Sequence, residues 1–166
     1  MVEVKIEAIR VNLIGQHRVV ILKDVDSERY LPVWIGPAEA DAITVQLTDT
    51  TPARPLTHDL MTALINKLGA KVLHVVINDL QNETFYARIQ LQTKVGAELS
   101  IDSRPSDAIN VAVRVKCPIY IEDNIMEAHA QFPEEEGTAA AVADEELGAF
   151  KDFLGSLDLD DLEKRS

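Results

Sequence analysis

Two short polar segments of this 166-residue chain hold the side chains best suited to catalysis or to binding a metal or a phosphate. Residues 102–107 (DSRPSD) place two acids, two hydroxyls and one arginine where a strand should give way to a helix. A helix start offers free backbone N–H groups to an anion. Arg104 could hold a phosphate through its guanidinium fork, and Asp102 and Asp107 could hold a hard cation such as Mg²⁺ or Mn²⁺. The alternative is a self-contained capping cluster, with Asp107 on the helix dipole and Arg104 paired to Asp102.

The second segment contains His58 and Asp59, which are expected just inside a helix. A histidine can act as a general acid or base because its pKa lies near neutrality, and Asp59 could bind a metal or compensate the helix dipole. Adjacent helical residues point about 100° apart, so these two side chains should not form a contacting pair. Glu39, near the start of another helix, is a further candidate, although its spacing alone favours dipole compensation.

The charge of the chain limits the classes of function. The net charge is −12, and residues 133–166 hold 11 acids against 3 bases, whereas residues 1–132 hold 17 against 13. A protein that grips nucleic acid by neutralising phosphates needs a basic surface, and neither part supplies one. The composition still permits an enzyme that contacts a phosphodiester briefly while a metal supplies positive charge. The sequence has no Gly-rich phosphate loop, zinc pattern, nucleophile elbow or dinucleotide fingerprint.

The apolar pattern predicts an α+β domain over residues 1–132. Strands are expected at 2–14, 17–23, 30–35, 71–79, 84–92, 96–102 and 118–121. Helices are expected at about 37–47, 58–68 and 104–116. Pro32 should place its strand at a sheet edge, because proline lacks a backbone N–H.

The order of these elements suggests an internal repeat. Three strands lead into residues 36–40 (GPAEA) and three more lead into residues 104–108 (RPSDA). In both segments a proline opens the helix, an acid follows two residues later and an alanine comes next. The pattern indicates two β-β-β-α units with helix 58–68 inserted between them. The alternative is that proline followed by an acid is a common helix opening.

Residues 133–166 are expected to form an acidic linker and an amphipathic helical tail. Apolar residues recur there at helical spacing, at Leu147, Phe150, Leu154 and Leu157. The tail could pack on its own body or on a neighbouring subunit, or it could dock on a basic protein partner through residues 144–162. The lone Cys117 indicates a reducing compartment, and no signal peptide or bilayer-length apolar run is evident. The sequence therefore predicts a cytoplasmic protein with no membrane segment.

Four segments, in their order and spacing, resemble the bifunctional nuclease family. They are residues 31–43 (LPVWIGPAEADAI), 54–61 (RPLTHDLM), 83–89 (ETFYARI) and 101–109 (IDSRPSDAI). Asn110 departs from the family pattern, where a small or apolar residue is expected. The resemblance implies an α+β fold, self-association into a homo-oligomer, and nuclease activity on DNA and RNA.

The family's shared polar residues fall on Glu39, His58, Asp59, Asp102, Ser103, Arg104, Ser106 and Asp107 of this chain. The resulting hypothesis is a metal-assisted phosphodiesterase that takes nucleic acid as a transient substrate. Glu39, Asp102 and Asp107 would gather Mg²⁺ or Mn²⁺. Arg104 would steady the phosphate and His58 would shuttle a proton. Asp59 and Ser106 are further catalytic candidates. The alternative function is a non-enzymatic module that oligomerises and binds a protein through its acidic tail.

Overall fold

The computed structural model describes residues 1–11 and 18–133, and a seven-stranded sheet contains many of them. The strands are β1 (Val2–Val11), β2 (Arg18–Asp24), β3 (Tyr30–Ile35), β4 (Lys71–Gln81), β5 (Thr84–Gln92), β6 (Glu98–Ser103) and β7 (Ile119–Ile121). Their order across the sheet is β3-β2-β1-β7-β4-β5-β6. The α+β prediction is confirmed, and β3, which contains Pro32, lies at a sheet edge. The turn predicted at residues 15–16 and the predicted tail lie outside the described residues.

The described residues form the helices α1 (Pro37–Leu47), α2 (Thr57–Lys67), α3 (Pro105–Val115) and α4 (Asp123–His129). Both α1 and α3 begin with proline, which suits the first helical position because an N–H there would lack a helical partner. α2 stops before Gly69, whose φ of 79° suits the end of a helix. α4 was not predicted. It buries the adjacent residues Ile125 and Met126, so a helical spacing is hard to detect in so short a segment.

Strands β1 to β3 and strands β4 to β6 each form an antiparallel meander that leads into a helix. β7 lies between the two meanders, antiparallel to β1 and parallel to β4. α2 lies between the first β-β-β-α unit and the second along the chain. The element order is therefore the predicted one, and an origin by duplication stays a prediction.

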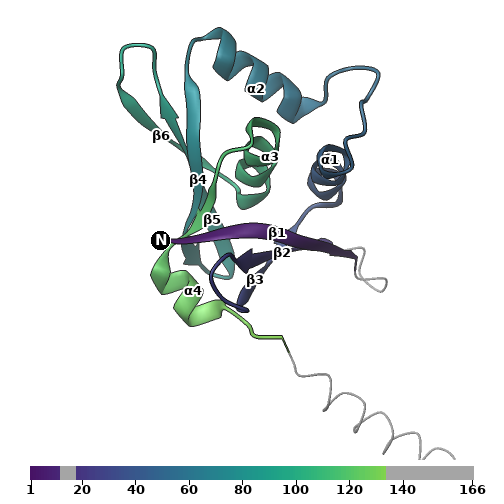
Figure 1. Ribbon diagram of the computed structural model, residues 1–166, viewed down its shortest axis with the longest axis vertical. Helices are drawn as coiled ribbons and strands as arrows, with labels where there is room; N and C mark the ends of the chain where they lie inside the picture. Colours follow the sequence, from purple (N-terminus) through teal and green to yellow (C-terminus); the bar gives the residue numbers. More distant parts are fainter. Residues whose placement is uncertain (12–17, 134–166) are drawn as a thin grey trace, which may run out of the picture. The chain divides into compact units, whose positions relative to one another are not determined.

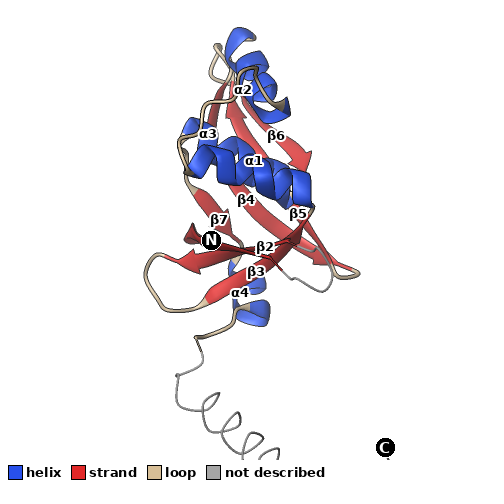
Figure 2. Ribbon diagram, turned by 90° about the vertical axis from the view of Figure 1, so that its right-hand side faces the viewer, coloured by secondary structure: helices blue, strands red, loops and turns tan. Residues whose placement is uncertain are grey.

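The sheet is bent, and Figure 1 shows its two meanders as arms with α1 and α3 in the angle between them. Figure 2 shows α1 in front of the sheet and α2 near one end. The core forms between these helices and the sheet, and its members include Val33, Ile43, Ile77, Ile89, Ile109 and Val111. Each large aliphatic side chain buried in this way contributes about 1.5–3 kcal/mol. Among the residues described, no helix has the length and apolar character needed to cross a membrane.

Candidate functional site

A pocket of about 690 Å³ lies where the first turns of α1, α2 and α3 approach one another. Its ionisable wall consists of Glu39 and Asp41 from α1, His58 from α2, and Arg104 and Asp107 from the start of α3. Small and apolar side chains of α1 and α2 form much of the remaining wall. The structure therefore brings together four of the residues singled out from the sequence, which are Glu39, His58, Arg104 and Asp107.

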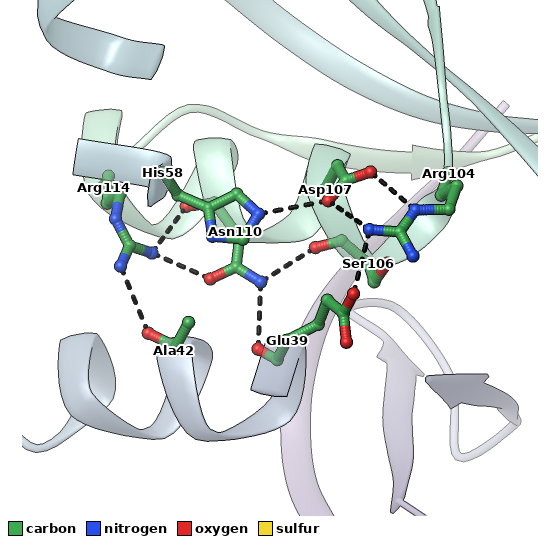
Figure 3. A network of polar contacts seen from close by, with 8 residues as sticks. All are labelled: Glu39, Ala42, His58, Arg104, Ser106, Asp107, Asn110 and Arg114. Atoms are coloured by element: carbon green, nitrogen blue, oxygen red, sulfur yellow. Dashed lines mark hydrogen bonds and ion pairs between the residues drawn. The ribbon is translucent and has the colours of Figure 1, made fainter. Parts of the chain in front are cut away.

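Arg104 joins two of the three carboxylates of this pocket, those of Glu39 and Asp107 (Figure 3). Its Nε donates to Oδ2 of Asp107 at 2.8 Å, and its Nη2 donates to Oδ1 of Asp107 at 3.0 Å and to Oε1 of Glu39 at 2.9 Å. These bonds use three of the five guanidinium N–H donors and leave the two on Nη1 for a ligand. The Arg104 side chain is 65% exposed, so an anion can reach it from solvent.

His58 contacts the same aspartate from the buried side of the pocket. The histidine is 7% exposed, and its Nε2 lies 3.1 Å from Oδ1 of Asp107. A neutral imidazole held by a carboxylate donates from that nitrogen and keeps the other, here Nδ1, as a proton acceptor. This arrangement of histidine and carboxylate suits general acid–base chemistry.

The same contacts set the charge state of Asp107. Burial alone would raise the pKa of the Asp107 carboxyl, but the hydrogen bonds from Arg104 and His58 outweigh it and hold the pKa below its ordinary value. Asp107 is therefore ionised at neutral pH, which is the state that orients the imidazole and anchors the guanidinium.

Glu39 reaches Arg104 by turning its carboxylate back over the residue that precedes α1. A Cβ at Gly36 would overlap Oε2 of Glu39. The φ of Gly36 is −69°, which any residue adopts. Position 36 therefore does not need glycine for its backbone conformation. A side chain there would instead occupy the space that the Glu39 carboxylate fills.

Asp59 does not line this pocket, although it neighbours His58 in sequence. Its Oδ2 accepts from the backbone N–H of Leu56 at 2.7 Å, and its Oδ1 accepts from Nε of Arg114 at 2.6 Å. Burial raises the pKa of the Asp59 carboxyl, but these two bonds outweigh it and lower the pKa overall. Both oxygens are thus engaged in starting α2 and joining it to α3.

Asn110 stood out in the sequence only as a departure from the family pattern, and its structural role was missed. It is completely buried, and its Nδ2 donates to the backbone oxygens of Glu39 and Ser106, each at 3.0 Å. Its Oδ1 accepts from Nη1 of Arg114 at 2.9 Å, and Nη2 of Arg114 also donates to the backbone oxygen of Ala42. Asn110 therefore ties α1 to α3 at the backbone of Glu39 (Figure 3). The sequence does contain a sign of this role. Asn110 is a polar residue within the apolar run of α3, and a buried polar side chain needs hydrogen-bond partners.

Asp102 is not brought to Glu39 and Asp107. It lies opposite Arg88 of β5, and residues directly opposite each other project from the same face of a sheet. Arg88 is exposed, whereas the alternating residues Ala87 and Ile89 are buried in the core that includes α3. Asp102 therefore projects from the opposite face. Over residues 1–11 and 18–133, no group of three or more His, Cys, Asp or Glu side chains is arranged to hold a metal.

The two serines of the same segment also differ in position. Ser106 is buried and lines a second pocket, of about 300 Å³, that shares Arg104 with the first. The Oγ of Ser103 is buried, with no hydrogen-bond partner in the described part of the chain. Neither serine lines the larger pocket.

Comparison with known proteins places these residues within a described family. The family model for the bifunctional nuclease domain matches residues 20–134. An uncharacterized protein of Mycobacterium tuberculosis is 40% identical over 164 residues, covering 97% of this chain and 98% of its own length. Bifunctional nuclease 1 of Oryza sativa subsp. japonica is 30% identical over 113 residues, covering 66% of this chain and 34% of its own length. Bifunctional nuclease 2 of Arabidopsis thaliana is 32% identical over 109 residues, covering 63% of this chain and 33% of its own length.

Proposed function

Because this chain belongs to the bifunctional nuclease domain family, we propose that the pocket at the starts of α1, α2 and α3 hydrolyses phosphodiester bonds of DNA or RNA. One observation carries the proposal. A histidine, a carboxylate and an exposed arginine share one pocket although His58 and Asp107 are 49 residues apart and Glu39 and Arg104 are 65 apart. Perturbed ionisable groups gathered in a pocket mark a candidate active site.

Each of these groups has a role in the proposed hydrolysis. The Nη1 donors of Arg104 hold a non-bridging oxygen of the phosphate. Nδ1 of His58 takes a proton from the attacking water while Asp107 stabilises the imidazolium that forms. The water oxygen bonds to phosphorus, the bond to the leaving oxygen on the opposite side breaks, and that oxygen takes a proton from solvent, to which the imidazolium later releases its own. Glu39 keeps the guanidinium in place through its bond to Nη2.

The charge of the pocket supports a role for a divalent cation. Three carboxylates, those of Glu39, Asp41 and Asp107, line the pocket together with one guanidinium, so a phosphodiester would meet net negative charge. Mg²⁺ binds through one or two carboxylates together with substrate phosphate oxygens. Glu39 and Asp107 lie in the pocket and would have to give up part of their bonding to Arg104 to hold the cation, whereas Asp102 projects from the opposite face of the sheet. We propose that Mg²⁺ or Mn²⁺ held there supplies positive charge at the phosphate.

We also propose a cytoplasmic location and self-association of the domain. Support for self-association comes from edge strand β6, where Leu99 and Ile101 are 45% and 46% exposed. An edge strand with exposed apolar side chains is a natural site for pairing with another chain. Light scattering of the wild type and Ile101→Lys tests this proposal, and an unchanged monomeric mass in both contradicts it.

The nuclease proposal is tested with purified protein and single-stranded DNA and RNA, with Mg²⁺, with Mn²⁺ and with EDTA. Asp107→Ala and Arg104→Ala should each lose activity, because both remove groups that line the pocket. Arg88→Ala is the matched control, since that arginine is exposed on the opposite face of the sheet. Cleavage that survives both pocket substitutions would place the activity elsewhere or in a contaminant. A wild type inactive under every condition would favour the alternative interaction module.

A further inference from the structure

Arg104 lines two pockets rather than one. The smaller pocket, of about 300 Å³, lies where the end of β3, the β4–β5 turn and the start of α3 meet. Its wall contains Trp34, Glu83, Phe85, Arg104, Pro105 and Ser106. A ligand whose anionic group sits on Arg104 in the larger pocket can therefore extend a second part into the smaller one.

Trp34 provides an aromatic wall for that second part. It is the only tryptophan of the chain and is 61% exposed, whereas its neighbours on the alternating face of β3, Leu31 and Val33, are each 1% exposed. A single exposed apolar residue is ordinary on a protein surface. Here the indole also borders a pocket beside an arginine, and aromatic rings next to a cation are the platforms on which unpaired bases stack.

Glu83 gives the smaller pocket a preference for one end of a nucleotide. It follows Asn82 in the β4–β5 turn, and both residues have positive φ angles, 61° and 49° respectively. Two successive residues with positive φ angles are typical of a tight hairpin turn, and this turn holds Glu83 at the wall of the smaller pocket. A carboxylate repels a phosphate but accepts hydrogen bonds from the N–H groups of a base. The phosphate is therefore favoured at Arg104 and the base at Glu83.

We infer that the smaller pocket is a nucleobase subsite, in which one unstacked base lies against Trp34 while its phosphate is bound by Arg104. The inference rests on the proposed function and specifies its substrate class, which is single-stranded DNA or RNA. A base that is stacked and paired in a duplex cannot enter such a pocket without being extruded. Guanine suits Glu83 best, because its N1–H and N2 amine present adjacent donors to one carboxylate.

The single tryptophan allows a test that needs no catalysis. The full chain is titrated in the presence of Mg²⁺ with guanosine 5′-monophosphate, uridine 5′-monophosphate or ribose 5-phosphate, none of which contains a phosphodiester bond to cleave. Trp34 fluorescence is followed after correction for nucleotide absorbance. We expect saturable quenching by the guanine nucleotide, weaker quenching by the uracil nucleotide and none by ribose 5-phosphate. Glu83→Gln should reduce the difference between the two nucleotides. Guanosine 5′-monophosphate that leaves the fluorescence unchanged would overturn the inference.

A second measurement separates this inference from the nuclease proposal. Base stacking on an aromatic ring contributes about 1–3 kcal/mol, so Trp34→Ala should raise KM for a single-stranded oligonucleotide by about 5- to 150-fold. Trp34→Phe should recover most of that loss. Phe132→Ala, which removes an aromatic residue that is 67% exposed and borders neither pocket, should keep the wild-type KM.

The outcomes distinguish the two ideas. Cleavage by the wild type with an unchanged KM in Trp34→Ala overturns the base subsite and leaves the nuclease proposal standing. Saturable quenching in a protein that cleaves nothing supports the base subsite and overturns the nuclease proposal. Quenching together with a raised KM in Trp34→Ala supports both.

Discussion

Replacing Asn110 by leucine should destabilise the domain far more than its small change in size suggests. The buried amide makes two hydrogen bonds to backbone oxygens and one with Arg114. A net hydrogen bond contributes about 1 kcal/mol, and one to a charged group about 1.5–3 kcal/mol. Leucine removes all three and leaves the backbone oxygen of Glu39 without that donor. We expect a loss of about 3–5 kcal/mol in the free energy of unfolding.

Urea denaturation followed by circular dichroism measures this loss. Asn78→Leu is the matched control, because Oδ1 of Asn78 is buried without a hydrogen-bond partner in the described structure. Removing an unpaired buried acceptor should leave stability unchanged or raise it. If Asn110→Leu costs no more than Asn78→Leu, then the hydrogen bonds of Asn110 do not hold α1 against α3.

Three further predictions concern single groups. Gly36→Ala should displace the carboxylate of Glu39 from Arg104. The loss of this one charged hydrogen bond should lower the nuclease rate by about tenfold. An undiminished rate would show that the space at position 36 is not needed to place Glu39. The folded-state pKa values of Asp59 and Asp107 are depressed, so their stabilisation is complete above the unfolded aspartate pKa of about 3.9 and is lost as the pH falls through the folded values. Thermal unfolding should therefore show a falling midpoint below about pH 4, and Asp59→Asn should make that fall shallower. Burial raises the pKa of the Cys117 thiol to about 11. At pH 8 the native protein should therefore react with iodoacetamide much more slowly than the unfolded chain does. Equal rates would show that this thiol is accessible in the folded protein.

Periodicity and turn chemistry were enough to predict most of the fold. Alternating apolar residues located the strands, Pro32 placed β3 at an edge, and the proline openings located α1 and α3. These features are local, because each depends on a few consecutive residues. The repeated order of strands and helices then indicated the two meanders, which the sheet order matches.

The candidate site was predictable only in part, because it depends on which way side chains point and on partners that are distant in the sequence. The sequence grouped Asp102 with Asp107 since both flank Arg104, but strand alternation turns Asp102 toward the opposite face. The helical step predicted that Asp59 and His58 would not contact each other, but no local pattern identified Arg114 as the partner of Asp59. The role of Asn110 could not be predicted, because its hydrogen-bond partner in α1, the backbone oxygen of Glu39, lies 71 residues away in the sequence.

The position of β7 has a consequence for how the domain is made. This three-residue strand joins β1 to β4, and the described strands contain no other bridge between the two meanders. It follows every helix that forms the pocket, so a ribosome must release residues up to Ile121 before the sheet becomes continuous. Contacts between segments so distant in sequence form slowly. A nascent chain stopped before residue 119 would carry two separate half-sheets, each with an uncovered edge, so the protein most needs protection from aggregation in the interval before β7 emerges.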